Sequence, residues 1–214
     1  VLYCTLYAFS TENWNRPIKE VQDLLSIVEQ SCKRFYNRLM QDKVRVKVLG
    51  DVTDERIPIG LRQSLEKIEN DTADNTANMK PPLTVCFALN YGGRKDIVNA
   101  SLKLAQAIAD HELKMDEVDE QIFSSFLSTR DIPDPDLIIR TSGESRLSNF
   151  LLWNAAYAEL YFTDVLWPDF DHEAWIEALQ WYAQRQRKFG GRKHILKKPP
   201  TTTNNNGAAA IHRK

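Results

Sequence analysis

The sequence predicts an α/β fold, in which a single domain carries a mainly parallel sheet flanked by helices. Short apolar runs typical of buried strands alternate along the chain with longer segments whose apolar residues recur at helical spacing. The chain has 214 residues, of which 43% are hydrophobic, so it can bury one sizeable core. None of its apolar runs approaches the length that spans a bilayer.

The predicted strands are apolar runs rich in aliphatic and aromatic residues, at residues 2–9, 44–49, 83–89 and 137–139. One more short strand is expected from residues 159–162 and 165–167. Helical periodicity predicts helices at residues 17–39, 59–69, 97–108, 121–127 and 171–189. The helix at 97–108 is expected to bury Ile97, Leu104 and Ile108 beside Val98, Leu102 and Ala105.

The composition changes near the C-terminus, and this change sets the predicted domain boundary. We expect residues 1–191 to form the α/β domain. Residues 192–214 are basic, contain no acidic residue and run into a TTTNNNGAAA segment, so we expect a disordered, solvated tail. Contact of this basic tail with an anionic membrane surface is the alternative.

Charge and cysteine usage exclude other classes of protein. A net charge of −1 argues against a general nucleic-acid binder, which needs a basic surplus for its phosphate contacts. Cys4, Cys32 and Cys86 lie far apart within apolar patterns, which indicates reduced thiols in an intracellular protein. The sequence does not distinguish the cytoplasm, the endoplasmic-reticulum surface or a plastid.

Three polar clusters follow predicted strands, at residues 10–16, 90–96 and 140–148. Because the carboxyl ends of parallel strands meet at one edge of a sheet, we expect these clusters to converge there. They bring arginines that suit a phosphate or diphosphate group: Arg16, Arg94, Arg140 and Arg146. The alternative is a polar loop whose arginines pair with nearby carboxylates such as Glu144 and Asp134.

Other catalytic signals are absent, since the chain has no Walker loop, GxGxxG, GxSxG or HExxH motif. Phosphate recognition without a protein nucleophile favours electrostatic catalysis, with a metal ion neutralising a diphosphate leaving group. Glu159 follows the apolar residues 155–158, so we expect it to be partly buried and to need a cation. Pairing of Glu159 with a neighbouring arginine is the alternative.

Long motifs in these same segments resemble those of the cis-prenyltransferases, which include undecaprenyl diphosphate synthase and dehydrodolichyl diphosphate synthase. The motifs are FSTENWNRP at residues 9–17, NYGGRKDI at 90–97 and IRTSGESRLSNFLLWNAAYAELYF at 139–162. WPDF at 167–170 and KFGG at 188–191 fit as well, so the resemblance covers residues 1–191. It implies Mg²⁺-dependent condensation of isopentenyl diphosphate onto an allylic diphosphate such as farnesyl diphosphate. It also implies an apolar tunnel for the growing chain and a homodimer or heterodimer.

The resemblance assigns roles by matching position. Isopentenyl diphosphate would be bound by Arg140, Arg146 and Ser148. Catalysis would be assisted by three residues between the two substrates, Ser10, Asn13 and Arg16. The remaining assignments are Trp14 and Glu20 on a mobile segment that closes over the site, Leu83 at the end of the tunnel, and Glu159 as a ligand of Mg²⁺.

The sequence departs from the family pattern in three places. The Asp-Gly-Asn-Gly-Arg-Trp loop, which supplies a metal-binding Asp and cradles the allylic diphosphate, is absent, and Val1 aligns downstream of it. Ser145 stands where many bacterial members have a His, and Lys188 replaces an Arg that reaches the partner's site. We therefore expect an N-terminally incomplete fold that binds but does not turn over. A non-catalytic subunit of a heterodimer is the alternative, and the retained arginines favour the enzyme.

Overall fold

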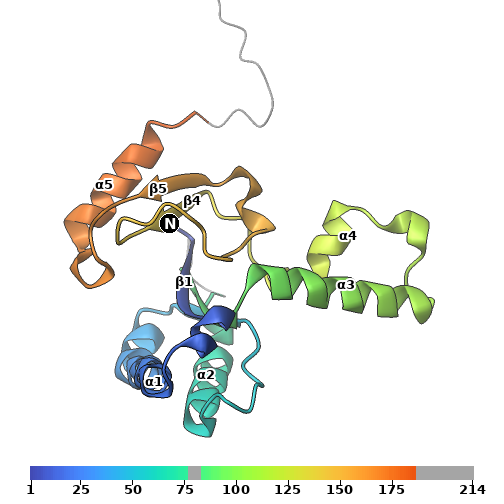
Figure 1. Ribbon diagram of the computed structural model, residues 1–214, viewed down its shortest axis with the longest axis horizontal. Coiled ribbons are helices and arrows are strands. Elements are labelled where there is room, and N and C mark those ends of the chain that lie inside the picture. Colours follow the sequence, from blue (N-terminus) through green and yellow to red (C-terminus); the bar gives the residue numbers. More distant parts are fainter. Residues whose placement is uncertain (77–82, 187–214) are drawn as a thin grey trace, which may run out of the picture.

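Three parallel strands form the central sheet of the protein (Figure 1). The computed structural model describes residues 1–76 and 83–186. Within these residues β1 (Tyr3–Ser10), β3 (Thr84–Tyr91) and β2 (Arg45–Leu49) lie in the order β1-β3-β2. Every pairing is parallel, and Thr84 lies opposite Tyr3 on one side and Arg45 on the other. The central position of β3 explains its almost uninterrupted apolar sequence, because a central parallel strand is covered on both faces.

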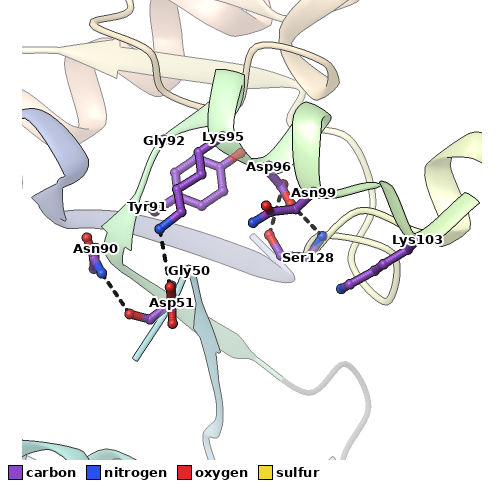
Figure 2. A pocket seen from close by; sticks show the side chains of 10 residues that line it. All are labelled: Gly50, Asp51, Asn90, Tyr91, Gly92, Lys95, Asp96, Asn99, Lys103 and Ser128. Atoms are coloured by element: carbon purple, nitrogen blue, oxygen red, sulfur yellow. Dashed lines mark hydrogen bonds and ion pairs between the residues drawn. The ribbon is translucent and has the colours of Figure 1, made fainter. Parts of the chain in front are cut away.

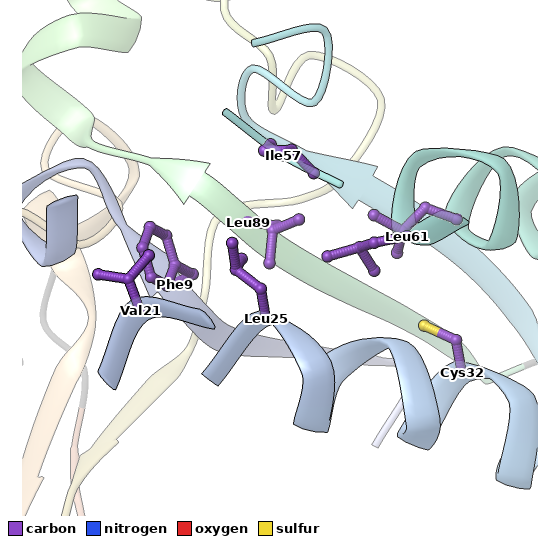
Figure 3. Close-up of a cluster of buried hydrophobic side chains, with 8 residues drawn as sticks. Phe9, Val21, Leu25, Cys32, Ile57, Leu61 and Leu89 are labelled. Carbon is purple, nitrogen blue, oxygen red and sulfur yellow. The ribbon is translucent and has the colours of Figure 1, made fainter. Parts of the chain in front are cut away.

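Two helices cover one face of this sheet, α1 (Ile18–Gln41) and α2 (Ile59–Asp71). Each begins directly after a proline, Pro17 or Pro58, whose fixed φ suits the approach to a helix. Figure 3 shows the core between the helices and the sheet, which consists of Phe9, Val21, Leu25, Cys32, Ile57, Leu61, Leu65 and Leu89. These side chains are at most 7% exposed, so their burial is the main source of stability in this part of the fold.

Strand residues of β2 and β3 and residues of the loop after β4, rather than a pair of helices, supply the second core cluster. It consists of Leu49, Cys86, Ala88, Tyr91 and Leu151, with Tyr7, Ile132 and Phe150 packed against it. Leu151 and Phe150 come from the segment that follows β4 (Leu137–Arg140), so this cluster joins distant parts of the chain. All three cysteines carry free thiols, as the sequence predicts.

The remaining strands form a second sheet. β4 pairs in parallel with β5 (Glu159–Phe162), and Leu137 lies opposite Glu159. α5 (His172–Ala183) lies against β5, where the Tyr161 and Trp181 rings are 5.2 Å apart. In Figure 1, β4, β5 and α5 lie together, on the side of the molecule away from α1 and α2.

Two further helices form an arm beside the central sheet, α3 (Gly93–Ala109) and α4 (Glu120–Ser125). The Asp96 carboxylate accepts hydrogen bonds from the Ser128 amide and hydroxyl, both at 2.9 Å, and so ties the base of α3 to the segment after α4. Short 3₁₀ turns complete the chain at Thr11–Asn15, Ala73–Thr76, Met115–Glu117, Asn154–Tyr157 and Trp167–Asp169.

The predicted α/β fold with parallel strands is confirmed, but three expectations need correction. The described strands fall into two sheets, not one. Residues 165–167 do not extend β5, because the chain turns into a 3₁₀ helix at Trp167 and Pro168 has no N–H to donate to a ladder. Val98 and Leu102 are 56% and 65% exposed, because α3 buries the small residues Ala100 and Ala107 instead.

The predictions for the C-terminus lie partly outside the described residues. α5 ends at Ala183, and residues 187–191, with the KFGG motif and Lys188, lie outside, as does the tail at 192–214. None of the helices in residues 1–76 and 83–186 combines the length and apolar composition needed to cross a membrane.

Truncation of Leu61, which is 0% exposed, should destabilise the fold far more than the same change at Leu102, which is 65% exposed. We expect Leu61→Ala to lower the free energy of unfolding by about 2–5 kcal/mol, because it removes buried surface and leaves a cavity. Leu102→Ala should change it by less than about 0.5 kcal/mol. Urea denaturation of the two variants measures both values. Equal losses would contradict the assignment of the α3 outer face to solvent.

Candidate functional site

The turn after β1 is held by local hydrogen bonds. The Ser10 amide donates to Asn13 Oδ1 at 2.8 Å, and both side chains are half-buried. Arg16 and Glu20 form an ion pair at 2.7 Å with 48% of each side chain exposed. The structure therefore fixes Ser10 and Asn13 and leaves Arg16 paired at the surface.

Trp14 is docked against the core, although the family resemblance assigns it to a mobile segment. Its indole Nε1 donates to Asn90 Oδ1 at 2.8 Å, and Asn90 is 2% exposed. The Trp14 ring lies edge-on to the Phe9 ring, with centroids 4.9 Å apart. The Arg56 guanidinium lies over the Trp14 ring, 4.2 Å from its centroid. Arg56 in turn binds Asp54, and its hydrogen bonds hold the pKa of that carboxyl well below the usual range. The segment that carries Trp14 is therefore packed against the central sheet in this structure.

The loop after β4 carries the predicted diphosphate ligands. Its backbone is fixed to the segment after β5, because the amides of Ser142 and Gly143 donate to the carbonyls of Val165 and Thr163 at 2.8 and 3.0 Å. Gly143 has a φ of +70°, which favours glycine. Arg146 forms an exposed ion pair with Glu144, so the alternative interpretation of this loop holds for Arg146. Ser148 is exposed.

Arg140 differs from Arg146 because it has no carboxylate partner among the described residues. It is the last residue of β4 and is half-buried, and no carboxylate in residues 1–76 and 83–186 forms an ion pair with it. Asp134, the other predicted partner, accepts from Asn154 Nδ2 at 2.8 Å instead. A half-buried guanidinium without a counterion at a strand end is suited to binding an anion.

The charge of Arg140 acts on Tyr7, a residue that the sequence did not single out. Burial and the charge of Glu12 raise the pKa of Tyr7 to about 12, while a hydrogen bond to Ser10 and the positive charge of Arg140 oppose the rise. The Tyr7 hydroxyl donates to the Tyr91 carbonyl at 3.1 Å, and its ring stacks on Phe150 with centroids 4.5 Å apart. Tyr7 therefore lies where β1, the end of β3 and the loop after β4 meet.

Asn149 connects the three polar clusters, and sequence reasoning missed it as well. Its carbonyl accepts from the Gly93 amide at 2.7 Å, and its side chain binds the Arg94 amide and Glu12 Oε1 at 2.8 and 2.7 Å. The predicted convergence of residues 10–16, 90–96 and 140–148 thus occurs through a side chain just beyond the third cluster. The Gly92-Gly93 pair was the available signal, because adjacent glycines indicate a close approach of backbone.

Two assigned residues lie away from the junction, that is, the place where β1, the end of β3 and the loop after β4 meet. Leu83 directly precedes β3, whereas Tyr91 is the last residue of that strand. Leu83 and Tyr91 are therefore about 26 Å apart at the usual rise of a strand. Glu159 is half-buried and lies opposite Leu137, which precedes Arg140 by about 10 Å along β4. No arginine or lysine pairs with Glu159 among the residues described, and no cluster of three His, Cys, Asp or Glu side chains there could hold a metal ion.

Two cavities lie near the junction. Figure 2 shows one of about 210 Å³ at the carboxyl ends of β2 and β3, where Lys95 reaches Asp51 at 3.2 Å. Gly50 at this edge has a φ of +106° and lies so close to the Leu89 carbonyl that a Cβ would meet it at 2.1 Å. The other cavity, of about 500 Å³, runs from Trp14 and Arg16 along the apolar residues Ile18, Val21 and Leu25.

The comparisons with known proteins agree with this architecture. A family model described as undecaprenyl diphosphate synthase matches residues 1–190. The chain belongs to the cis-prenyltransferase family. An isoprenyl transferase of Bacillus subtilis is 46% identical over 187 residues, which cover 87% of this chain and 69% of the relative.

Two further relatives extend the agreement. A ditrans,polycis-undecaprenyl-diphosphate synthase of Pasteurella multocida, named as specific for (2E,6E)-farnesyl diphosphate, is 47% identical over 87% of this chain and 75% of its own. The crystal structure of lavandulyl diphosphate synthase from Lavandula x intermedia, in complex with dimethylallyl diphosphate, has a TM-score of 0.82 at 34% identity. It covers 89% of this chain and 79% of that one. The protein is thus a prenyltransferase, and the predicted family is confirmed.

The raised pKa of Tyr7 makes the stability of this cis-prenyltransferase sensitive to alkaline pH. Its folded-state pKa of about 12 exceeds the usual value of 10.0, so the folded chain keeps a proton that the unfolded chain releases. The contribution of Tyr7 to stability is therefore complete below about pH 10 and falls as the pH rises toward about 12. Denaturant titrations at several alkaline pH values should show a shallower decline for Tyr7→Phe than for the unsubstituted chain. An identical slope in the two proteins would refute the role of Tyr7.

Proposed function

We propose that the protein serves the Mg²⁺-dependent condensation of isopentenyl diphosphate onto an allylic diphosphate, which extends a cis-polyprenyl chain. The observation that carries this proposal is Arg140, a half-buried guanidinium without a carboxylate partner in the described part of the chain, at the carboxyl end of a parallel strand. Ligands of open α/β sheets bind at such strand ends. The names of the relatives, which refer to farnesyl and dimethylallyl diphosphates, support the class of substrate.

Arg140 is the proposed centre of the isopentenyl diphosphate site, with Arg146 and Ser148 beside it on the same loop. Arg146 would exchange the exposed Glu144 carboxylate for a diphosphate oxygen, a small cost because exposed ion pairs are weak. Ser10 ends β1 and Asn13 lies in the turn that follows, and Tyr7 on β1 meets this loop. The Ser10 and Asn13 side chains are proposed to contact the reacting ends of the substrates. Arg16 is proposed to contribute charge once it leaves Glu20.

The cavity beside α1 is proposed to take the start of the allylic hydrocarbon. It is lined by Ile18, Val21 and Leu25, with Trp14 and Arg16 at one end. Apolar walls with a cation at the mouth suit an amphiphile that has a diphosphate head. Leu83, at the far end of β3, is proposed to affect the length of the product.

The donor set of this chain fits Mg²⁺ only together with a substrate. Mg²⁺ commonly binds one or two carboxylates and completes its shell with substrate phosphates and water. Glu159 is a half-buried carboxylate without a cationic partner in the described residues, and we propose it as the protein ligand. When bound, Mg²⁺ would neutralise negative charge on the diphosphate leaving group.

A dimer, either of identical or of different chains, is also proposed. Large apolar side chains on β5 and just after it are exposed: Leu160 (37%), Phe162 (38%), Leu166 (55%) and Trp167 (61%). A cluster of exposed apolar side chains of this kind is typical of a surface that another chain covers. A non-catalytic subunit would show the same surface, so only the substrate site distinguishes the two alternatives.

Substitution of Arg140 tests the proposed function directly. Arg140→Ala should weaken binding of isopentenyl diphosphate by about 10- to 100-fold, because hydrogen bonds to charged groups contribute about 1.5–3 kcal/mol. The affinity of Arg140→Lys should lie between those of the unsubstituted chain and Arg140→Ala, since lysine keeps the charge but loses the planar fork. Arg34→Ala, at an exposed position on α1, is the matched control and should leave binding unchanged. Calorimetric titration measures each affinity.

The same titration with and without Mg²⁺ tests Glu159. Mg²⁺ should strengthen binding of isopentenyl diphosphate by the unsubstituted chain, and Glu159→Gln should remove this gain but keep the affinity that is measured without metal. Unchanged affinity in Arg140→Ala would overturn the proposed site. A full Mg²⁺ gain in Glu159→Gln would overturn the metal assignment only.

An incorporation assay separates binding from turnover. With labelled isopentenyl diphosphate, farnesyl diphosphate and Mg²⁺, we expect this 214-residue chain to form little or no lipid-soluble product. The reason is that no group of three His, Cys, Asp or Glu side chains in the described residues could hold the metal ion around Glu159. Rapid, Mg²⁺-dependent product formation would show that no further carboxylate is required. A chain that binds neither substrate would favour a non-catalytic subunit.

A further inference from the structure

Asn149 contacts two other parts of the site, and each contact uses a different group of the residue. Its main-chain carbonyl accepts from the Gly93 amide at 2.7 Å, and its side-chain Oδ1 accepts from the Arg94 amide at 2.8 Å. Its side-chain Nδ2 donates to Glu12 Oε1 at 2.7 Å. The first two contacts hold the start of α3, and the third holds the turn that follows Ser10.

We propose that Asn149 is a positioning residue that couples the diphosphate-binding loop to the Ser10–Asn13 turn through Glu12. This inference rests on the proposed function, because it assigns the loop at residues 140–148 to isopentenyl diphosphate. Asn149 directly follows Ser148 and is not among the residues proposed to bind substrate. It fixes where the loop lies relative to the turn. A diphosphate held by the loop then lies beside the side chains of the turn.

The backbone around Asn149 is held in an unusual conformation. Ser148, Asn149 and Leu151 have φ values of +48°, +66° and +44°, in the left-handed region that residues other than glycine rarely adopt. Asparagine tolerates this region better than most residues, but serine and leucine do not share that advantage. Such a conformation persists only where the surroundings enforce it, and the contacts of Asn149 supply that enforcement.

The glycines at the start of α3 make room for this loop. A Cβ on Gly92 would lie 2.7 Å from Asn149 Nδ2 and 2.5 Å from Thr11 Oγ1. A Cβ on Gly93 would lie 2.9 Å from the Leu152 amide nitrogen, which is main chain and cannot move aside easily. The Gly-Gly pair of the NYGGRKDI motif thus serves the docking of residues 149–152.

Glu12 is a charged acceptor, which strengthens its bond with Asn149. Burial alone would raise the pKa of Glu12, but hydrogen bonds from Asn149, its own backbone, Thr11 and Ser10 together lower it. Glu12 is therefore ionised near neutral pH and accepts a charge-assisted hydrogen bond. Glu12 belongs to the same turn as Asn13, so any movement of Asn149 is passed to that turn.

Coupling of this kind is reciprocal. A ligand that orders the loop at Arg140, Arg146 and Ser148 favours the position of the turn in which Ser10 and Asn13 are bonded. Loss of the Asn149–Glu12 bond should therefore weaken diphosphate binding even though both residues remain away from the ligand. A residue that only stabilised the fold would lower the melting temperature without affecting the affinity of the folded chain.

The test exchanges donor and acceptor between the two residues. In Asn149→Asp the carboxylate can still accept from the Arg94 amide, but its second oxygen faces the Glu12 carboxylate and is repelled. We expect this variant to bind inorganic pyrophosphate and isopentenyl diphosphate at least about tenfold more weakly. In the double variant N149D/E12Q the new amide can donate to the new carboxylate, and most of the affinity should return. Asn37→Asp, at an exposed position on α1, introduces the same charge and should have no effect.

Calorimetric titration well below the melting temperature, with folding checked by circular dichroism, gives these affinities. Glu12→Ala is the second variant, should N149D not fold, and it should lose affinity several-fold because only the acceptor is removed. Unchanged affinity in the folded single variants, or failure of the double variant to recover, would overturn the proposal.

Hydrogen exchange separates this inference from the proposed function. Amide exchange across residues 145–152 and the first turn of α3 should be faster in N149D and return to the original rate in N149D/E12Q. If the unsubstituted chain binds neither pyrophosphate nor isopentenyl diphosphate, the proposed function is wrong, and the exchange rates alone then decide whether Asn149 holds the loop. Equal exchange rates in all three proteins would refute that role.

Discussion

The close approach of the 149–152 backbone to Gly92 and Gly93 is the constraint on which the rest of the site depends. The described strands form two sheets that share no ladder, so their relative placement is set by other contacts. Asn149 supplies polar contacts, and the packing of Phe150 and Leu151 against Tyr7 and Tyr91 supplies apolar ones. Both lie where the carboxyl ends of β1 and β3 meet the loop after β4. A larger residue at either glycine would separate these parts.

The site combines a rigid frame with unsatisfied charge. Arg140 is held at the end of a strand, without a counterion in the described residues, while most other cations near the site have carboxylate partners. An uncompensated guanidinium costs stability in the free protein, and that cost is recovered when an anion binds. The left-handed residues Ser148, Asn149 and Leu151 add backbone strain at the same place. Both features are typical of a binding site that is formed before its ligand arrives.

The sequence was sufficient for the elements and for the family, because both depend on local patterns. Apolar runs predict β1, β2, β3 and β4 to within about two residues, since a strand is defined by its own side chains. The packing of α3 could not be read in this way. Its larger apolar residues, Val98 and Leu102, predict a buried face, yet the helix packs through Ala100 and Ala107, which allow close approach. Hydrophobic periodicity depends on the size and polarity of each residue. It does not show which face of a helix packs closely against a neighbouring element.

The site was predictable in its charges but not in its connections. The arginines were visible, and the alternative of an internal ion pair proved correct for Arg146 and not for Arg140. Glu144 lies close in sequence to both arginines, and the sequence alone does not say which of them it pairs with. Asn149 and Tyr7 were missed for a similar reason. Each contacts residues that are distant in the sequence, and single-sequence reasoning does not reach that far.

The separation of the two sheets has a consequence for how the molecule opens. Backbone hydrogen bonds distribute cooperativity along a sheet, but between these sheets the described residues are joined by side chains and a few loop amides. We therefore expect β4, β5 and α5 to open more readily than the core under α1 and α2. A partial opening of this kind would remove Arg140 from the junction without exposing Leu25 or Leu61. The anion site would then be lost before the core under α1 and α2.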